Sequence, residues 1–411
     1  MFAILSKGMN NMSAPTTNNT SNKQGVKVLL AGSLLQLFLG IIYVWSVFAA
    51  PVSAQLNWDI ESVKLTSSFM LSFFVVGILV SGKLQTKVPT QYLSLAGGLM
   101  LAVGTFATAF VPASTPWLTY ITYGVVGGFG VGAAYSAVLA TAQQWFPKNR
   151  GFATGVSVCA FGFATVIFAP LVELLVGRFG LKSTFLILSA AFLAMVLATF
   201  RFIKLPQTAA AGQAAAAIPE QKQFTLKEAL ATKEFYFITV SMMLGTAAYF
   251  VLNPSFKTMA ADRGLEGAFA TGLVMVTGVA NALGRLVLPL LSDKIGHTRA
   301  AFAGLAATTI CAFLLCFVQG FAFMAVVAVI AFCFGGYSGT YPVITAGYFG
   351  AKNMGAIYGA VMVGFAFSAL LLPMGIGLIS SVTAKFIVLG TMAAVGTALA
   401  ALLIALKKKK A

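Results

Sequence analysis

The most constraining feature of this sequence is a succession of apolar runs, each about long enough for a helix to cross a lipid bilayer. A hydrocarbon core of about 30 Å needs roughly 20 apolar residues in a helix. Twelve runs meet this requirement, at 28–50, 63–82, 92–112, 117–143, 152–176, 183–203, 235–256, 268–291, 299–319, 322–346, 354–380 and 385–406. Because a backbone in lipid must satisfy its hydrogen bonds internally, these runs predict an all-α membrane protein with twelve transmembrane helices.

The composition excludes a soluble globular protein. Hydrophobic residues make up 59% of the 411 residues and charged residues only 9%, whereas a soluble domain carries about 25% charged residues. The 41 glycines fit a membrane protein, because small residues let transmembrane helices pack closely. We therefore expect a multi-pass protein whose outer surface contacts the lipid bilayer.

The chain divides into two similar halves. The segment Trp145–Gly155 recurs loosely at 348–359, in each half between the fourth and fifth runs. Copies separated by six spans keep the same orientation, which predicts 6+6 parallel repeats with a substrate site between them. The expected parts are a disordered cytoplasmic tail (1–27), an N-terminal six-helix bundle (28–203), a cytoplasmic linker (204–234), a C-terminal six-helix bundle (235–406) and a basic tail (407–411).

The net charge of +17 is distributed as the positive-inside rule requires, except in the loop between the fifth and sixth runs, which holds Arg178 and Lys182. If the N-terminus is cytoplasmic, 19 of the 26 Lys and Arg fall in cytoplasmic segments, six in outer segments, and one, Arg285, inside the eighth run. Both termini are therefore predicted to be cytoplasmic, in a protein of the cell (inner) membrane. The basic segments would face anionic lipid headgroups, which explains the charge without a nucleic-acid partner.

The sequence contains few side chains of the kinds that form catalytic sites. The only histidine is His297, and the four cysteines lie inside apolar runs, where buried thiols behave as small hydrophobic side chains. No segment matches a nucleotide-binding loop, a Ser/His/Asp set or the ligand spacing of a zinc site. We expect no enzyme activity, no cofactor, no metal and no obligate protein partner.

Arg285 is the strongest candidate for a site residue. An arginine at the centre of a membrane helix costs about 2.5–3.5 kcal/mol on insertion, and no Asp or Glu lies at a matching depth in the other runs. An unpaired guanidinium suits an anion, because its planar fork binds a carboxylate in bidentate fashion. The alternative is that Arg285 braces helix ends through backbone carbonyls. Asn281, one turn earlier on the same face, could bond a substrate oxygen or a neighbouring helix.

The sequence resembles the major facilitator superfamily. The resemblance rests on the twelve helices, the 6+6 repeats and the loop Gly284–His297, which is similar to a G…DKxGR-like loop motif of that family. The equivalent loop of the first half, Ser81–Lys87, lacks the aspartate. Three stretches, Gly40–Pro51, Trp145–Gly151 and Asn281–Arg285, resemble the branch of oxalate/formate antiporters and monocarboxylate transporters.

This resemblance implies a secondary carrier of small carboxylates, with Arg285 as the partner of the anion. The oxalate carriers also have a lysine in the eleventh helix, where this chain has Val361 and no lysine in the whole run. That difference argues against a dicarboxylate. We expect proton-coupled symport of monocarboxylates such as lactate or pyruvate by alternating access. The alternative is an anion exchanger of the oxalate/formate type.

Tyrosines complete the expected site. The helices that line the cavity in this superfamily would carry four of them, each with a hydroxyl on an apolar ring, namely Tyr123, Tyr337, Tyr341 and Tyr358. Each could instead serve packing. Three phenylalanines could shape the same cavity, namely Phe74, Phe334 and Phe365.

The sequence does not identify the group that would carry the proton. Arginine does not release a proton in proteins. Members of the monocarboxylate family are typically proton-coupled, and some place an aspartate where this chain has Asn281. The remaining candidates are Asp262 and Glu173, near the outer face, or the substrate itself. Both acids could equally be solvated residues at the surface.

Overall fold

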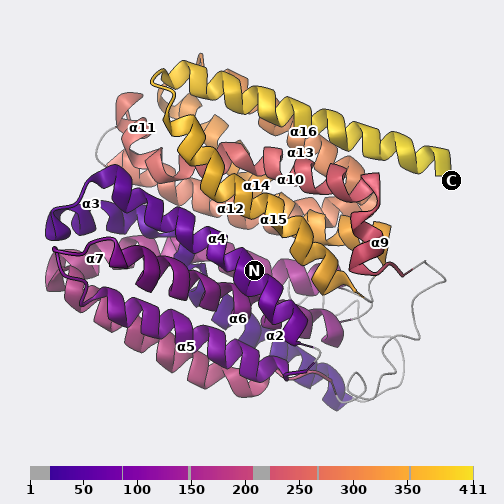
Figure 1. The fold of residues 1–411 in the computed structure, drawn as a ribbon, viewed down its shortest axis with the longest axis horizontal. Helices are drawn as coiled ribbons and strands as arrows, with labels where there is room; N and C mark the ends of the chain where they lie inside the picture. The colour runs from indigo at the N-terminus through magenta and orange to yellow at the C-terminus, as the bar shows by residue number, and fades with distance from the viewer. Residues whose placement is uncertain are drawn as a thin grey trace.

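The computed structural model describes residues 19–85, 87–146, 150–206, 223–265, 268–350 and 353–410. Within these residues the chain is helical and forms no strand. The long helices lie side by side, with residues up to about 200 on one side of the molecule and the remainder on the other (Figure 1). This agrees with the all-α class that the apolar runs predict.

The helices follow one another through short connections. The first half contains α2 (Asn19–Leu39), the 3-10 helix η1 (Gly40–Tyr43), α3 (Trp45–Leu56), α4 (Ile60–Leu84), α5 (Thr90–Thr108), the π-helix η2 (Tyr120–Gly127), α6 (Gly128–Trp145), α7 (Arg150–Thr199) and the 3-10 helix η3 (Phe200–Phe202). The second half contains α9 (Leu226–Leu230), α10 (Lys233–Leu252), the 3-10 helix η5 (Asn253–Ser255), α11 (Phe256–Asp262), α12 (Ala268–Ile295), α13 (His297–Leu314), α14 (Gly320–Phe349), α15 (Met354–Gly377) and α16 (Val382–Lys410).

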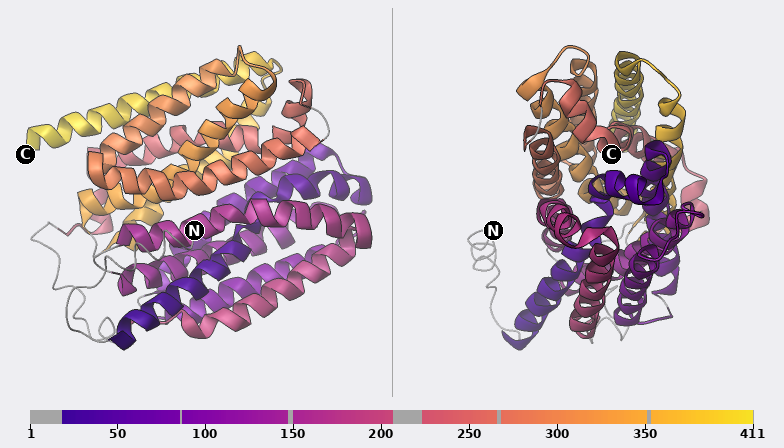
Figure 2. Two further views of the ribbon diagram at one scale, coloured as in Figure 1. Left: turned by 180° about the vertical axis from the view of Figure 1, so that it is seen from behind. Right: turned by 90° about the vertical axis from the view of Figure 1, so that its left-hand side faces the viewer.

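The two ends of the bundle differ in which segments they hold. The start of α2, the helix α9 and the end of α16 lie at one end, which we call the α9 end (Figures 1 and 2). The junction of α3 with α4 and the helix α11 lie at the opposite end, the α11 end (Figure 1).

The first helix begins earlier than expected. The sequence predicts a disordered tail over residues 1–27, but α2 is already helical from Asn19. Gly25 lies against the rings of Trp145 and Phe146, and this packing at the end of α6 extends the apolar helix by further turns. Residues 1–18 lie outside the described part of the chain.

The fifth and sixth apolar runs form one continuous element, α7, with a sharp break. The break is at Gly180, whose φ of 76° and ψ of 168° are not helical. A positive φ of this kind is readily adopted only by glycine. The two runs are therefore separate helices that reverse direction at one residue.

Nine helices of the described residues are long and apolar enough, by length and composition, to cross a membrane. One of these, Phe152–Phe202, contains the break at Gly180. Each of the twelve apolar runs lies largely within helices. Twelve crossings, the parallel repeats and the cytoplasmic termini remain predictions.

The end of the predicted linker is ordered. Residues 207–222 lie outside the described part. Beyond them, Thr225 opens α9 with a capping box that it forms with Glu228. The Asn353 side-chain amide donates to the Phe224 carbonyl at 2.7 Å. This contact holds the start of the second half against the junction of α14 and α15.

Glycines bring pairs of helices together in each half. A Cβ atom on Gly132 of α6 would lie 1.9 Å from the Phe74 carbonyl oxygen of α4, and one on Gly284 of α12 would lie 1.9 Å from the Phe332 carbonyl oxygen of α14. Only glycine permits backbones to approach this closely. In this way α6 packs against α4 in the first half, and α12 packs against α14 in the second.

Candidate functional site: a buried arginine between the two halves

Arg285 lies inside the protein, away from any lipid-facing surface. The residue is only 1% exposed. The Nε atom donates a hydrogen bond to Asn281 Oδ1 at 3.0 Å, one helical turn earlier on α12. A terminal nitrogen donates to the Tyr43 hydroxyl at 3.0 Å. Asn281 thus orients the guanidinium from its own helix, and Tyr43 does so from the other half of the chain.

Two aromatic rings of the first half also contact the guanidinium. Its central carbon lies 5.4 Å from the centre of the Phe161 ring and 5.5 Å from that of Tyr43. The two rings meet edge to face at 5.6 Å. Electron-rich ring faces stabilise a cation, so η1 and α7 of the first half provide much of the surroundings of a charge carried by the second half.

No carboxylate neutralises Arg285 within the described residues. The groups that act electrostatically on Arg285 are the hydroxyls of Tyr43, Tyr135 and Tyr249, and no Asp or Glu is among them. Hydrogen bonds engage Nε and one terminal nitrogen of Arg285, and both acceptors are neutral. A buried charge without a counter-ion is costly. An anion that reached the guanidinium would remove that cost.

Small residues allow the helices to approach at this point. A Cβ atom on Gly162 of α7 would lie 3.0 Å from Ala282 Cα and 3.2 Å from Arg285 Cδ. A Cβ atom on Gly335 of α14 would lie 2.0 Å from the Asn281 carbonyl oxygen. The packing of α7 and α14 against α12 therefore depends on glycine and fixes the positions of Asn281 and Arg285.

Three further tyrosines lie within electrostatic range of the charge. Tyr135 of α6, Tyr249 of α10 and Tyr358 of α15 all interact electrostatically with Arg285. Tyr249 is buried in the same core cluster as Tyr43. Its ring is stacked on Phe334 at 3.9 Å. Both halves thus contribute hydroxyl groups that could orient a small polar ligand.

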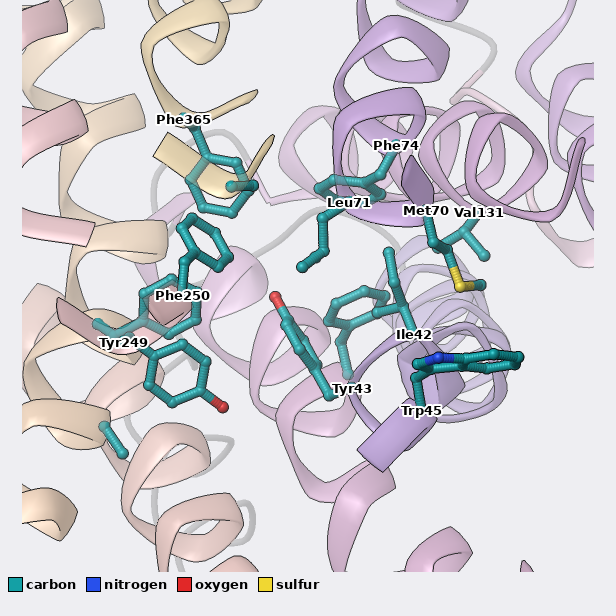
Figure 3. Packing of buried hydrophobic residues seen from close by; sticks show 14 of the residues in the cluster. Ile42, Tyr43, Trp45, Met70, Leu71, Phe74, Val131, Tyr249, Phe250 and Phe365 are labelled. Atoms are coloured by element: carbon teal, nitrogen blue, oxygen red, sulfur yellow. The ribbon is translucent and has the colours of Figure 1, made fainter. Parts of the chain in front are cut away.

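Aromatic side chains of the two halves face each other around Tyr43 (Figure 3). Tyr43 projects from the first half toward Tyr249 and Phe250 of the second. The phenylalanines expected to shape a cavity belong to this buried cluster, namely Phe74, Phe334 and Phe365. Phe334 lies 6.3 Å from Tyr43, ring centre to ring centre.

The four tyrosines predicted from the sequence to lie in the site occupy different environments in the structure. Tyr358 lies near Arg285, as described above. The hydroxyl of Tyr337 is paired with Thr308 at 2.7 Å, and that of Tyr341 donates to Ser241 at 3.0 Å. These bonds tie α14 to α13 and α10 inside the second half. Tyr337 and Tyr341 are thus engaged in packing interactions away from the guanidinium.

Tyr123 lies in a separate aromatic cluster of the first half. Its ring centre is 4.6 Å from that of Trp45 and 6.1 Å from that of Phe185. Its hydroxyl is buried and has no hydrogen-bond partner among the described residues. The structure does not bring Tyr123 to Arg285.

The two acids considered as proton carriers lie at the surface. Glu173 of α7 and Asp262, the last residue of α11, are both exposed. The structure does not place either of them in the buried cluster around Arg285. Within the described residues, no group of three His, Cys, Asp or Glu could hold a metal ion.

Sequence reasoning missed four residues around Arg285, namely Tyr43, Tyr135, Phe161 and Tyr249. Tyr43 lies within Gly40–Pro51, a stretch that already carried the family resemblance, so a search of that stretch for hydroxyl groups would have found it. Tyr135, Phe161 and Tyr249 stand in apolar helices among many similar aromatic residues. Nothing in the local pattern separates these three from packing residues.

Comparison with known proteins agrees with this architecture. The family model described as Major Facilitator Superfamily matches residues 29–373 and 238–411. The MFS-type transporter YhjX of Escherichia coli (strain K12) is 27% identical over 84% of this chain and 86% of its own length. The oxalate:formate antiporter of Oxalobacter formigenes is 25% identical over 85% of each chain. Monocarboxylate transporter 13 of Rattus norvegicus is 24% identical over 63% of this chain and 59% of its own.

These relatives confirm the branch indicated by Gly40–Pro51, Trp145–Gly151 and Asn281–Arg285. The matched regions run through both halves, including the helices that hold Arg285 and Tyr43. With its apolar helices, the chain is a multi-pass membrane protein. It belongs to the major facilitator superfamily.

Proposed function

We propose that this protein is a secondary active transporter of small monocarboxylates, such as lactate or pyruvate, and that Arg285 binds the substrate carboxylate. The observation that carries the proposal is a guanidinium that is 1% exposed and has only neutral partners among the described residues. The relatives named as an oxalate:formate antiporter and a monocarboxylate transporter support transport of organic anions. Because these relatives are transporters, we propose no enzyme activity.

One charge favours a substrate with one carboxylate. Tyr135, Tyr249 and Tyr358 are neutral hydroxyl donors near Arg285, and α15 contains no lysine. A second carboxylate would therefore be desolvated without a cation to pair with it, which is costly. The keto or hydroxyl oxygen of pyruvate or lactate could instead bond Asn281 or Tyr249.

Neutralisation of Arg285 provides a mechanism for alternating access. Pairing of the substrate with the guanidinium in a dry site removes the cost of the bare cation and favours a closed, occupied state. Arg285 belongs to the second half, while Tyr43 and Phe161 belong to the first. When the two halves close, residues of both therefore contact the guanidinium and its bound substrate. The halves then reopen on the opposite side of the membrane.

Uptake of labelled lactate, pyruvate, formate and oxalate into proteoliposomes tests the substrate. We expect lactate and pyruvate to be transported and Arg285→Lys to lower kcat/KM at least tenfold, because lysine cannot form the bidentate pair. Arg263→Lys is the matched control, since Arg263 donates to the Leu315 and Val318 carbonyls. Near-normal transport by Arg285→Lys would overturn the role of Arg285.

A proton symporter and an anion exchanger should behave differently in uptake assays. We favour symport in which the proton accompanies the substrate, because Asp262 and Glu173 are exposed. Net uptake driven by an imposed pH gradient, retained after Asp262→Asn and Glu173→Gln, is the expected result. Strict dependence on internal substrate would instead identify an exchanger, the activity that the name of the Oxalobacter relative describes.

We also propose that both termini are cytoplasmic, in the cell (inner) membrane. The start of α2 and the end of α16 lie at the same end of the bundle, and the basic residues Lys407–Lys410 favour the cytoplasmic side. A protease should remove a C-terminal tag from inside-out vesicles and leave it intact in right-side-out vesicles. The reverse pattern would invert the topology.

A further inference from the structure

An aromatic pair recurs in the repeated segment that joins the fourth and fifth apolar runs of each half. The pair is Trp145–Phe146 at the end of α6 and Tyr348–Phe349 at the end of α14. In each pair the first residue is half-buried and the second is buried. Neither pair is among the residues described around Arg285, so the repeat points to a role outside the proposed substrate site.

The first residue of each pair donates a hydrogen bond to the backbone at or just after the last helix of its half. Trp145 Nε1 donates to the Lys204 carbonyl at 2.7 Å, beyond the end of η3. The Tyr348 hydroxyl donates to the Leu403 carbonyl of α16 at 3.2 Å. Tryptophan and tyrosine can make the same connection because each carries a donor at the edge of a large apolar ring.

The second residue of each pair packs against the first long helix of its half. Phe146 belongs to a buried cluster with Leu29 of α2, and a Cβ atom on Gly25 would lie 3.5 Å from its ring. The Phe349 ring lies 6.5 Å, centre to centre, from that of Phe235 on α10. At the α9 end, one pair therefore connects α2, α6 and the end of η3, and the other connects α10, α14 and α16.

The two described ends of the predicted linker are attached to the same pairs. Lys204, at the start of the linker, accepts the bond from Trp145. Near the other end, the Phe224 amide donates to the Phe349 carbonyl at 3.0 Å, and the two rings meet edge to face at 5.5 Å. The linker is thus fastened to one pair in each half, which gives the recurrence of the segment a physical reason.

We propose that the two pairs are clasps, each of which makes the helices of its own half move as one rigid body. The first clasp is formed by Trp145 and Phe146, and the second by Tyr348 and Phe349. The proposal rests on the proposed function for the motion itself, in which the halves rock against each other. Each clasp joins helices of one half only, so it stays closed while the halves separate. Without it, the first or last helix could move independently of its half at the α9 end.

Distances within each half test the clasps directly. Spin labels are attached to cysteines introduced into a chain whose four native cysteines are replaced by serine or alanine. The first-half label pair is at the exposed positions Gln24 and Phe202, and the second-half label pair is at the exposed positions Tyr236 and Ala405. Pulsed electron paramagnetic resonance then gives the distribution of distances between the two labels. In the parent we expect narrow distributions that are the same with and without lactate.

Removal of one hydrogen-bond donor should loosen one half. Trp145→Phe keeps an aromatic ring and deletes the N–H, so it should broaden the distribution of the first-half label pair at least 1.5-fold and leave that of the second-half label pair unchanged. Tyr348→Phe deletes the O–H and should do the reverse, so each half is the control for the other. Unchanged distributions in both variants, or broadening in both halves by a single variant, would overturn the proposal.

Transport kinetics test the effect of the clasps on motion. Trp145→Phe and Tyr348→Phe should each lower kcat for lactate at least threefold and leave the KM within twofold, because the substrate site is intact while the helices no longer move together. Trp117→Phe and Tyr92→Phe are the matched controls, since these side chains are 53% and 52% exposed, and they should leave kcat unchanged. A raised KM with a normal kcat would show an effect on the substrate site and overturn the role in motion.

The distance measurements need no transport, so this proposal and the proposed function can fail separately. Broadened distributions in a protein that does not transport lactate would support the clasps and overturn the proposed function. Unchanged distributions in a protein whose lactate transport depends on Arg285 would overturn the clasps alone. Broadening without any fall in kcat would show that transport tolerates a loosened half, which overturns the role of the clasps in motion.

Discussion

Arg285 on α12 donates a hydrogen bond to the hydroxyl of Tyr43, a residue 242 positions away in the other half of the chain, at 3.0 Å. The bond joins the two halves at the most deeply buried charge of the described residues. In the proposed mechanism, breaking this bond frees the guanidinium for the substrate, and forming it joins the halves when no substrate is bound. This pairing is the basis of the first prediction.

Tyr43→Phe should destabilise the ligand-free protein and strengthen its response to substrate. The change keeps the ring contact at 5.5 Å and removes an acceptor from a buried charged donor, which costs about 1.5–3 kcal/mol. Thermal unfolding measures this loss. Saturating lactate should restore most of the stability, because its carboxylate replaces the hydroxyl as acceptor. An unchanged melting temperature without lactate would contradict the prediction.

Asn281→Asp should create an ion pair between the new carboxylate and the Arg285 guanidinium. The new carboxylate would lie about where Asn281 Oδ1 accepts from Arg285 Nε, at 3.0 Å, and would form the ion pair that the parent lacks. We expect higher thermal stability and a KM for lactate raised at least tenfold at neutral pH, because two anions compete for one guanidinium.

The same variant should make uptake depend on pH with a definite sign. Protonation neutralises the introduced carboxylate and frees Arg285, so lactate uptake by Asn281→Asp should rise as the pH falls. Asn281→Ala is the control, since it removes the bond to Nε without adding a charge. Uptake by Asn281→Asp that varies with pH no more than that of Asn281→Ala would show that no competing ion pair forms.

The sequence predicted the helices well and the surroundings of Arg285 only in part. Long apolar runs predict helices reliably, because lipid offers the backbone no hydrogen-bond partners outside the helix. A single arginine within such a run also stands out as a candidate site residue. The neighbours of Arg285 come from η1, α6, α7, α10 and α15, and a helix that is apolar on every side has no periodic pattern to show which face meets the other half. The sequence therefore could not show that the hydroxyls of Tyr337 and Tyr341 bond Thr308 and Ser241 inside the second half.

Tyr337→Phe and Tyr341→Phe should affect stability and not substrate affinity. Their hydroxyls bond Thr308 and Ser241 inside the second half, so each change should cost about 0.5–1.5 kcal/mol and leave the KM for lactate within twofold. Tyr358→Phe is the contrasting variant, because Tyr358 interacts with Arg285. It should raise the KM several-fold with little change in melting temperature. Equal KM values for all three variants would remove Tyr358 from the site.

Gly335→Ala should damage the site through packing alone. A Cβ atom there would lie 2.0 Å from the Asn281 carbonyl oxygen and 2.7 Å from Asn281 Oδ1, so α14 must move away from α12. Overpacking of this kind costs about 1–3 kcal/mol, and thermal unfolding should show that loss. The displaced Asn281 can no longer orient the Arg285 guanidinium, so lactate uptake should fall at least fivefold.

Gly375→Ala provides the matched control for Gly335→Ala. A Cβ atom on Gly375 of α15 would meet no other atom within 4 Å, and alanine favours a helix over glycine by about 1 kcal/mol. This variant should keep or raise the melting temperature and transport lactate normally. If Gly335→Ala behaved in the same way, α12 and α14 could separate at Asn281 without harm. The position of the guanidinium would then not depend on the close approach of these two helices.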